Sequence, residues 1–498
     1  MVVLGELVDE RPPFSFTHAE RELVLAQQPP TMHEWNAPNG RVFSLQVPPT
    51  VYPPREDTNF MASVLAKIGL PEGSTWLEIG CGSGALSLFA ASMGCQVVAC
   101  DINPFAAACS RAHFHDHELP ASVFEGGPGP LDDGPMAQWG GDRRYDYVVW
   151  NMPYLPRPSD AGPLLGPLEE ASLIDTDSTG LYERLLTSIA RGELLRDEGL
   201  ALLLTSSKGI GEDALEQAWQ RGLAATVVDS LEFDDGERLS VVGVWHPFAN
   251  ASRVVMETVE STNTHLMQST DAVGSSLMAI RQTNGRGRRQ RSWVGFDAAL
   301  FASWVVDDGP NGAHQPLDQL VIGVGLVRLL RCFAPEHTNQ VCLKWPNDVY
   351  VLDTDAGAWK KASGILFEAT TKGPNTRVVA GVGVNIQTPE HEWFGGLEAL
   401  GVDINASWLY RCVDAMLSSH YEAPAGKHAL PSWFNFREAR DLVTEGITTL
   451  GPLLYRGKEV SGTLVDSGAI LLDGQTIATD APEELVWSNI KFSIEDGV

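Results

Sequence analysis

The N-terminal half of the chain alternates short apolar runs, which predict buried strands, with amphipathic stretches, which predict helices. The rhythm is that of a doubly wound α/β sheet. A last pair of runs, at 225–233 and 238–245, is close enough in sequence to form an antiparallel hairpin. Six of the runs predict strands, and we expect them to belong to a Rossmann-like sheet of seven strands that ends in this pair. The other segments that carry the pattern are 74–80, 84–94, 95–103, 104–114, 145–151, 181–191 and 199–207.

A change of pattern near residue 245 divides the chain. Residues 246–252 (HPFANAS) read as a linker, and a second α/β unit begins with VVMETVESTN at 254–263. After about Leu442, short alternating strands with Gly and Asp turns predict a small β-barrel. A chain of 498 residues is also too long for one hydrophobic core. We therefore expect three domains, at residues 1–248, 252–441 and 442–498.

The composition narrows the class of protein. With 44% hydrophobic and 20% charged residues the chain reads as soluble and globular, and no apolar run approaches the roughly 18 residues that span a bilayer. The segment MVVLGELVDERPPF lacks the basic and apolar regions of a secretory signal. Seven scattered cysteines without a CxxC pair favour a reduced, cytoplasmic protein. The formal charge of −29 repels polyphosphate backbones, so we do not expect DNA binding.

A cationic segment at 285–293 (GRGRRQRSW), called here the arginine loop, is the first candidate for binding chemistry. Its glycines let the backbone close over a ligand, and guanidinium groups bind phosphate through paired hydrogen bonds. Trp293 offers an apolar plane to a heteroaromatic ring. Alone, the segment could equally be a basic surface patch or a nucleic-acid-binding tail. The arginines are Arg286, Arg288, Arg289 and Arg291.

Five short segments accompany the arginine loop: ESTN at 260–263, RQT at 281–283, LKWPNDVYV at 343–351, KKASGILFE at 360–368 and VVAGVGVNI at 378–386. Their order and spacing resemble the biotin protein ligase family over residues 252–490. The resemblance implies a class II synthetase-like α+β catalytic domain followed by a small SH3-like β-barrel. It also implies that biotin and ATP give biotinyl-5′-AMP, whose biotin passes to a lysine of a biotin carboxyl carrier protein. The chain contains no carrier motif of the AMKM type, so we expect the carrier in trans.

This reaction accounts for the residue types, because the biotin carboxylate must approach the α-phosphate of ATP. Two unit charges about 4 Å apart repel by about 4 kcal/mol at an effective dielectric constant of about 20. By resemblance, Arg286, Arg288 and Lys361 neutralise this repulsion as catalytic residues. The resemblance assigns biotin binding to Ser261, Thr262, Asn263, Gln282, Arg286, Gly287, Arg288 and Lys361. It assigns ATP binding to Arg288, Arg291, Trp293, Lys344, Asp348 and Asn385.

Three features qualify the resemblance. A Mg²⁺ ion that bridges the ATP phosphates is expected from the reaction and not from a cluster of protein ligands, so no protein metal site is predicted. The family loop usually has glycine where this chain has Gln290, which would stiffen the loop. Trp345 and Pro346 are expected to be scaffold, and Lys360 is expected to be a solvated neighbour of Lys361.

The segment WLEIGCGSGA places three glycines between a predicted strand and a predicted helix. Gly80, Gly82 and Gly84 let the backbone approach an adenosyl ligand closely, and Glu78 can orient the amino-acid end of S-adenosylmethionine. Asp101, at the end of the next strand, can bind ribose hydroxyls. By itself this pattern could equally hold a dinucleotide.

The tetrapeptide NMPY at 151–154 favours methyl transfer to a nitrogen atom. The Asn151 side chain and the Met152 carbonyl can accept hydrogen bonds from a planar NH₂ group, and Tyr154 can stack on its plane. With VYPPREDTNF at 51–60, the motif resembles the release-factor glutamine N5-methyltransferases over residues 40–248. The resemblance implies a class I S-adenosylmethionine-dependent methyltransferase. It assigns cofactor binding to Asp57, Thr58, Glu78, Gly80, Gly82, Gly84, Asp101 and Asn151, acceptor binding to Asn151, Met152, Pro153 and Tyr154, and catalysis to Asn151 and Tyr154.

The methyl acceptor stays open at this point. The usual tetrapeptide is NPPY, Met152 replaces its first proline, and rRNA adenine methyltransferases carry a related NLPY. We therefore expect a bifunctional protein whose N-terminal half methylates a protein such as a release factor. The alternatives are methylation of nucleic-acid adenine and a module that has lost activity. The sequence HFHDH at 113–117 is expected to be the exposed end of a helix and not a metal site.

Overall fold

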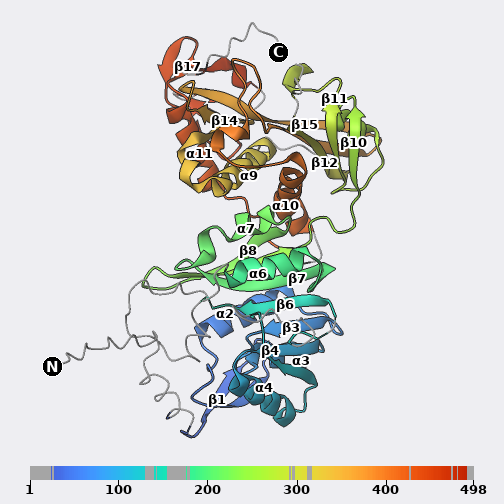
Figure 1. Ribbon diagram of the computed structural model, residues 1–498, viewed down its shortest axis with the longest axis vertical. Helices are drawn as coiled ribbons and strands as arrows, with labels where there is room; N and C mark the ends of the chain where they lie inside the picture. Colours follow the sequence, from blue (N-terminus) through green and yellow to red (C-terminus); the bar gives the residue numbers. More distant parts are fainter. Residues whose placement is uncertain are drawn as a thin grey trace, which may run out of the picture. The chain divides into compact units, whose positions relative to one another are not determined.

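The structure is a computed structural model that describes residues 24, 27–128, 139–141, 143–153, 175, 180–290, 293, 296, 298–310, 317–425, 428–472, 475–478, 481–488 and 490 (Figure 1). The chain folds into two compact units. Unit 1 comprises Met1–Leu215, Ala225–His246 and Lys427–Pro431. Unit 2 comprises Glu216–Ala224, Pro247–Gly426 and Ser432–Val498. The domain boundaries expected from the sequence stay predictions, because a division into compact units does not test which segments fold alone.

Unit 1 is built on the seven-stranded sheet that the sequence predicted, in the order β5-β4-β3-β6-β7-β9-β8. The strands from β3 to β7 run parallel to their neighbours, and β7 pairs antiparallel with β9. All five residues of β3 are buried, as expected for a parallel strand covered on both faces. The strands are β3 (Thr75–Ile79), β4 (Gln96–Asp101), β5 (Ala121–Glu125), β6 (Tyr145–Asn151), β7 (Leu195–Ser206), β8 (Ala224–Glu232) and β9 (Arg238–Trp245).

Helices α2 (Glu56–Ile68), α3 (Ala85–Ser92), α4 (Pro104–Asp116) and α6 (Leu181–Ala190) accompany this sheet. An antiparallel hairpin of β1 (Thr31–Asn36) and β2 (Val42–Val47), which was not predicted from the sequence, precedes the sheet in the chain. Alternate residues of β2 are buried, and β2 packs against α4. The hairpin is thus held by the period-2 apolar pattern of a half-buried strand.

Unit 2 contains a second seven-stranded sheet, in the order β10-β11-β12-β16-β15-β14-β13. β10 and β11 pair in parallel and the other adjacent strands of this sheet pair antiparallel, which gives a mixed sheet. The strands are β10 (Arg253–Val259), β11 (Ser276–Gln282), β12 (Ala299–Gly309), β13 (Val341–Lys344), β14 (Asp348–Asp353), β15 (Ala358–Lys372) and β16 (Asn375–Asn385).

Four helices pack against this sheet: α8 (Thr262–Gln268), α9 (Asp318–Phe333), α10 (Ala406–Ala425) and α11 (Phe436–Thr449). Residues 216–224, which include most of α7 (Ala214–Gln220), also belong to unit 2. There the Trp219 indole N–H donates to Ser419 Oγ at 3.0 Å, and its ring lies 5.1 Å from that of Trp433. Glu216 forms an ion pair with Arg328 of α9.

The C-terminal strands form two three-stranded sheets, β18-β17-β22 and β19-β20-β21, and closure of these sheets into a barrel stays a prediction. The strands are β17 (Leu453–Tyr455), β18 (Lys458–Val460), β19 (Thr463–Leu464), β20 (Ile470–Leu472), β21 (Gln475–Ile477) and β22 (Leu485–Trp487). In the described part of the chain, helices are too short or too polar to cross a bilayer.

Candidate functional sites

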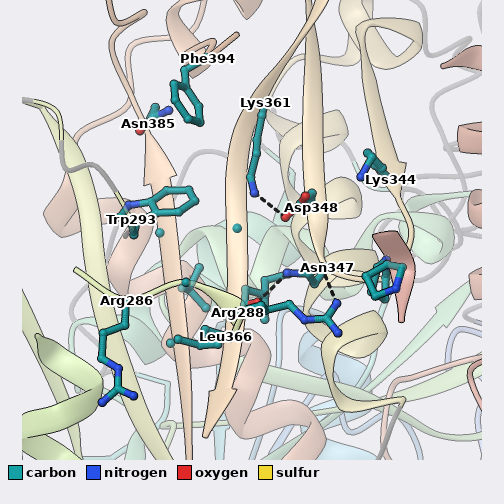
Figure 2. A pocket seen from close by; sticks show the side chains of 18 of the residues that line it. Arg286, Arg288, Trp293, Lys344, Asn347, Asp348, Lys361, Leu366, Asn385 and Phe394 are labelled. Carbon is teal, nitrogen blue, oxygen red and sulfur yellow. Dashed lines mark hydrogen bonds and ion pairs between the residues drawn. The ribbon is translucent and has the colours of Figure 1, made fainter. Parts of the chain in front are cut away.

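A pocket in unit 2 brings together the residues that the ligase resemblance selected (Figure 2). Arg291 lies outside the described residues, and every other predicted biotin or ATP contact lines the pocket. The roles assigned to these residues remain predictions, whereas their convergence is a fact of the structure. They are Ser261, Thr262, Asn263, Gln282, Arg286, Gly287, Arg288, Trp293, Lys344, Asp348, Lys361 and Asn385.

An irregularity of β15 directs the Lys361 side chain into this pocket. Consecutive residues Val349 and Tyr350 of β14 face Ser363 and Lys361, so that one residue of β15 is extra and the strand is bulged. Bulges of this kind redirect a side chain. The Lys361 ammonium lies 2.8 Å from Asp348 Oδ1 in an ion pair and 5.3 Å from the centroid of the Trp293 ring. The ammonium of Lys361, one of the predicted catalytic cations, is therefore flanked by a carboxylate and an aromatic face.

Three glycines of β15 and β16, named here the glycine floor, shape the base of the pocket. A Cβ atom on Gly364 or Gly383 would lie 2.6 or 2.8 Å from the Trp293 indole. A Cβ atom on Gly381 would collide with the Asn263 side chain. The motifs SGIL and VVAGVGVN thus need glycine because other pocket residues occupy the space above the sheet.

The described start of the arginine loop, residues 285–290, sends its arginines in different directions. Arg288 Nη1 donates to Asn347 Oδ1 at 3.3 Å, on the side of the pocket where Lys361 lies. Arg286 points away from Lys361 in Figure 2 and pairs with Glu368 at 2.9 Å. The predicted catalytic groups Arg288 and Lys361 therefore face one cavity, while the ion pair with Glu368 holds Arg286 at the edge of that cavity.

The other end of the pocket is a network of side-chain hydrogen bonds. Gln282 Oε1 accepts from the backbone N–H of Thr262 at 2.9 Å and from its hydroxyl at 3.2 Å. Ser303 Oγ lies 2.7 Å from Thr262 Oγ1 and 2.6 Å from Asn263 Oδ1, and its single proton can serve one of them at a time. Ser261 caps α8 by accepting from the backbone N–H of Thr264. These polar groups are pre-oriented, as a buried ureido ring requires.

Asn385 ends β16 and has one unsatisfied atom. Its Nδ2 donates to the Gly395 carbonyl at 3.2 Å, and its Oδ1 is buried without a hydrogen-bond partner among the residues that the structure describes. A buried acceptor without a partner costs about 1–3 kcal/mol, so a ligand donor is expected there.

Several pocket residues were not identified from the sequence. The C-terminal segment supplies Trp487 of β22, whose ring lies 4.6 Å from Lys344 Nζ, and Glu483, which precedes β22 and forms an ion pair with Arg289. No motif marked them, because they lie far along the chain in a segment read only as strand pattern. The remaining ones are Phe296, Phe301, Ala302, Pro346, Asn347, Tyr350, Gly364, Ile365, Leu366, Gly381, Val382, Gly383, Phe394, Pro482, Leu485, Val486 and Ile490.

Trp345 is a buried scaffold residue, and its indole N–H donates to the Gly468 carbonyl at 2.9 Å. Pro346 lines the pocket. Lys360 was expected to be solvated, but its side chain is 15% exposed and its ammonium lies 2.8 Å from Asp353 Oδ2. That expectation was wrong, because β14 places a carboxylate within ion-pairing distance of Lys360 as well as of Lys361.

A second pocket lies in unit 1, at the carboxyl ends of β3, β4 and β6. The turn from β3 into α3 has positive φ at Gly80, Gly82 and Gly84, with values of 65°, 51° and 81°. Gly82 N–H donates to Asp101 Oδ2 at 2.8 Å, and the N–H of Asn103 donates to Asp101 Oδ1 at 2.8 Å. Asp101 thus holds two loops at the point where a switch in strand order creates a ligand crevice.

Glu78 lines this pocket as a buried acid. It accepts a hydrogen bond from Ser87, whose hydroxyl in turn accepts from the Trp76 indole N–H at 3.2 Å. Burial raises the pKa of the Glu78 carboxyl to about 8, against the opposing effect of the Ser87 hydrogen bond. Burial of Glu78 therefore favours the neutral acid at neutral pH.

This raised pKa predicts a pH-dependent stability of unit 1. The folded state holds the Glu78 proton more tightly than the unfolded state, so its contribution is full below about pH 4.5 and is lost as pH rises to about 8. Glu78→Gln should match the wild type at pH 5 and be the more stable protein at pH 8.5. Hydrogen exchange of the β3 and β4 amides measures this in unit 1 alone. Equal protection of both proteins at pH 8.5 would contradict the assigned cause.

The NMPY segment and the PREDT segment meet at a hydrogen bond. Asn151 Nδ2 donates to Asp57 Oδ2 at 2.8 Å, and Asp57 Oδ1 accepts from the backbone N–H of Thr58 at 2.7 Å. Because Asp57 accepts from its NH₂ group, the side chain of Asn151 is oriented so that its carbonyl oxygen can accept a hydrogen bond from a ligand. Asp57, Thr58, Asn151, Met152 and Pro153 line the pocket with Glu78, Gly80, Gly82 and Asp101. Tyr154 lies outside the described residues, and Gly84 lies behind the pocket, where a Cβ atom would meet Ser110 Oγ at 2.8 Å.

The HFHDH segment contains a structural histidine. His113 is buried, its Nε2 accepts from the Gln46 backbone N–H at 2.9 Å, and its Nδ1–H donates to the Ser83 carbonyl at 2.8 Å. The expectation of an exposed helix end holds for His115 but was wrong for His113. His113 instead ties the β1–β2 hairpin to the glycine turn. In the described ranges, no group of three or more His, Cys, Asp or Glu residues is arranged to hold a metal ion.

Comparison with known proteins gives two separate matches. Residues 253–385 match the model of the biotin/lipoate A/B protein ligase family, and residues 77–133 match the model of a methyltransferase domain. The bifunctional ligase/repressor BirA of Salmonella typhimurium is 36% identical over 138 residues, which are 26% of this chain and 40% of that protein. The release factor glutamine methyltransferase of Geobacter sulfurreducens is 29% identical over 149 residues, 29% of this chain and 49% of that protein.

A solved structure, the biotin protein ligase from Aquifex aeolicus in complex with biotin and ATP, is 24% identical with a TM-score of 0.35 and covers 48% of this chain and 97% of that one. The matched stretches span less than two thirds of the two curated relatives. The chain therefore joins a methyltransferase domain to a domain of the biotin/lipoate A/B protein ligase family.

Proposed function

We propose that the unit 2 pocket activates biotin with ATP and transfers it to a lysine of a biotin carboxyl carrier protein. The observation that carries this proposal is the convergence of Lys361, Arg288 and the polar network around Thr262 on one pocket. The relatives support it, since the matched region of BirA belongs to a protein named a ligase.

In the first step a biotin carboxylate oxygen attacks the α-phosphorus of ATP, the bond to the bridging oxygen breaks, and pyrophosphate leaves. Lys361 and Arg288 offset the repulsion between the two anions, in a pocket where an effective dielectric below that of water strengthens their effect. Mg²⁺, when bound with ATP, neutralises phosphate charge. The Asp348 carboxylate lies in the pocket beside Lys361 and is the residue that fits such an ion.

In the second step the carrier lysine amine attacks the biotinyl carbonyl and AMP leaves, so that an amide and a proton are formed. The unpaired Asn385 Oδ1 is suited to a donor of the nucleotide, and Trp293 can cover its ring. Exclusion of water protects the mixed anhydride until the carrier arrives.

Full-length protein tests this proposal directly. Incubation with biotin, ATP and Mg²⁺ should give biotinyl-AMP by mass spectrometry and biotin-dependent ATP–pyrophosphate exchange. Added biotin carboxyl carrier domain should then gain biotin on a single lysine. If neither the adenylate nor exchange is formed, the ligase proposal is wrong.

We also propose that unit 1 transfers a methyl group from S-adenosylmethionine to a nitrogen atom, with a protein glutamine as the acceptor. The Asp57–Asn151 hydrogen bond carries this proposal, because it directs an acceptor atom of Asn151 at a planar NH₂ group. The nitrogen attacks the methyl carbon, the carbon–sulfur bond breaks, and S-adenosylhomocysteine and a proton are released.

All seven cysteines are free thiols, which favours a reducing, cytoplasmic location for both reactions.

Labelled S-adenosylmethionine separates the acceptor classes. We expect label in protein when full-length protein is mixed with cell extract, and a purified release factor as its acceptor. Label in RNA would identify a nucleic-acid methyltransferase instead. Absence of cofactor binding at millimolar concentration would identify an inactive module.

A further inference from the structure

Glu368, on β15 behind the unit 2 pocket, contacts two pocket residues at once. Its Oε1 lies 2.9 Å from Arg286 Nη2, and its Oε2 accepts from Asn263 Nδ2 at 3.0 Å. Arg286 belongs to the arginine loop, and Asn263 belongs to the polar network at the other end of the pocket. Glu368 itself does not line the pocket among the described residues. One carboxylate therefore joins the two parts of the site without facing the ligand.

The geometry on each side shows what this carboxylate fixes. Asn263 is buried, and with its NH₂ group on Glu368 its Oδ1 is turned toward Ser303. The Arg286 guanidinium has a second, longer contact to Thr264 Oγ1 at 3.4 Å, and its side chain is 44% exposed. The Glu368 side chain is 20% exposed, so its ion pair is only partly screened by water.

We infer that Glu368 is a positioning residue of the ligase reaction, which orients Asn263 for the ring of the bound acid and anchors the start of the arginine loop through Arg286. This inference rests on the proposed ligase function. The anchor, which is the ion pair of Arg286 with Glu368, lies two residues before Arg288, whose guanidinium reaches the pocket at Asn347. Loss of the anchor leaves Arg288 attached to a looser backbone, so the pocket retains its adenylate less well.

Glu368→Gln separates the two contacts. A glutamine oxygen can still accept from Asn263, whereas its NH₂ group would oppose the guanidinium, which is also a donor. We expect biotin affinity within about threefold of the wild type, and release of preformed biotinyl-AMP about tenfold faster. Glu368→Met loses both contacts, so biotin affinity should fall about tenfold as well. Asp466→Asn removes an acid from an exposed pair with Arg440 and is the matched control, expected to behave as the wild type.

The experiment uses full-length protein loaded with labelled biotin and ATP, freed of small molecules by rapid gel filtration, and chased with unlabelled biotinyl-AMP. A double-mutant cycle with Arg286→Lys supplies a readout that loss of folding would not give. Lysine keeps the charge but cannot span Glu368 and Thr264 together, and an exposed loop residue does not endanger the fold. Each single variant should speed release, and the double variant should be no faster than the faster single one.

The outcomes separate this inference from the function beneath it. If the wild type forms no biotinyl-AMP, the proposed function fails. If the wild type forms it and Glu368→Gln releases it at the wild-type rate or more slowly, the ligase stands and the anchor is refuted. Additive effects in the cycle would also refute it, because they would show that Glu368 and Arg286 act independently.

Discussion

Lys361→Met should lower the rate of biotinyl-AMP formation about 100- to 1000-fold, the usual cost of removing one preorganised group that stabilises transition-state charge. Methionine keeps the length and apolar stem of lysine and removes the ammonium that lies 2.8 Å from Asp348. The biotin carboxylate and the α-phosphate then meet without one of the cations that line the cavity. Biotin-dependent ATP–pyrophosphate exchange measures the loss.

Lys360→Met is the matched control for this prediction. The two lysines are adjacent on β15, their side chains are 15% and 17% exposed, and each lies 2.8 Å from a carboxylate of β14. Only Lys361 lines the pocket among these two. Lys360→Met should therefore keep exchange within about threefold of the wild type. Equal losses in both variants would mean that the effect comes from the sheet and not from the reaction.

Asn151→Ala should abolish most methyl transfer, by about 100-fold or more, because the acceptor nitrogen loses the group that aligns its lone pair with the methyl carbon. Binding of S-adenosylmethionine should weaken much less. Asp57→Leu should have an intermediate effect of about tenfold, since Asn151 keeps its amide but can rotate and present NH₂ to an NH₂ acceptor. Label transfer to protein and equilibrium cofactor binding are the two measurements.

Asn39→Ala supplies the control, because Asn39 is an exposed residue that donates to Ser92 on the surface of the same unit. If Asn151→Ala retained wild-type label transfer, the NMPY segment would have no part in the reaction. If Asp57→Leu lost cofactor binding in proportion to activity, Asp57 would be a cofactor contact and not an orienting residue.

Most strands of the unit 1 sheet could be predicted from the sequence because their patterns are local. Runs such as Thr75–Ile79 are mostly apolar and are followed by glycines, so both the buried strand and the turn after it are visible in a few residues. Those pocket residues that were predicted were found for the same reason, since each lies in a short motif. The β1–β2 hairpin was missed, although the alternation of β2 was present, because six residues carry a weak signal.

The direction in which individual side chains point could not be predicted from the sequence. Lys361 enters the pocket through a bulge opposite Val349 and Tyr350, and a bulge is set by pairing between strands. Arg286 and Arg288 look equivalent in the sequence, but Glu368, 82 positions after Arg286, draws one of them to the edge of the pocket. The contributions of Glu483 and Trp487 depend on how a distant segment folds back, which no local pattern encodes.

Residues 216–224 belong to unit 2, and this limits how the two proposed reactions can be separated experimentally. A fragment that begins after the linker at residue 252 would lack the indole that packs on Trp433 and the carboxylate that pairs with Arg328. It would expose the apolar surface around Trp433 and leave Glu438 as the remaining carboxylate partner of Arg328, on helices that support the unit 2 sheet. Silencing one activity at a time by point substitution in the intact polypeptide is therefore the sound approach, and failure of a truncated ligase would say nothing about its chemistry.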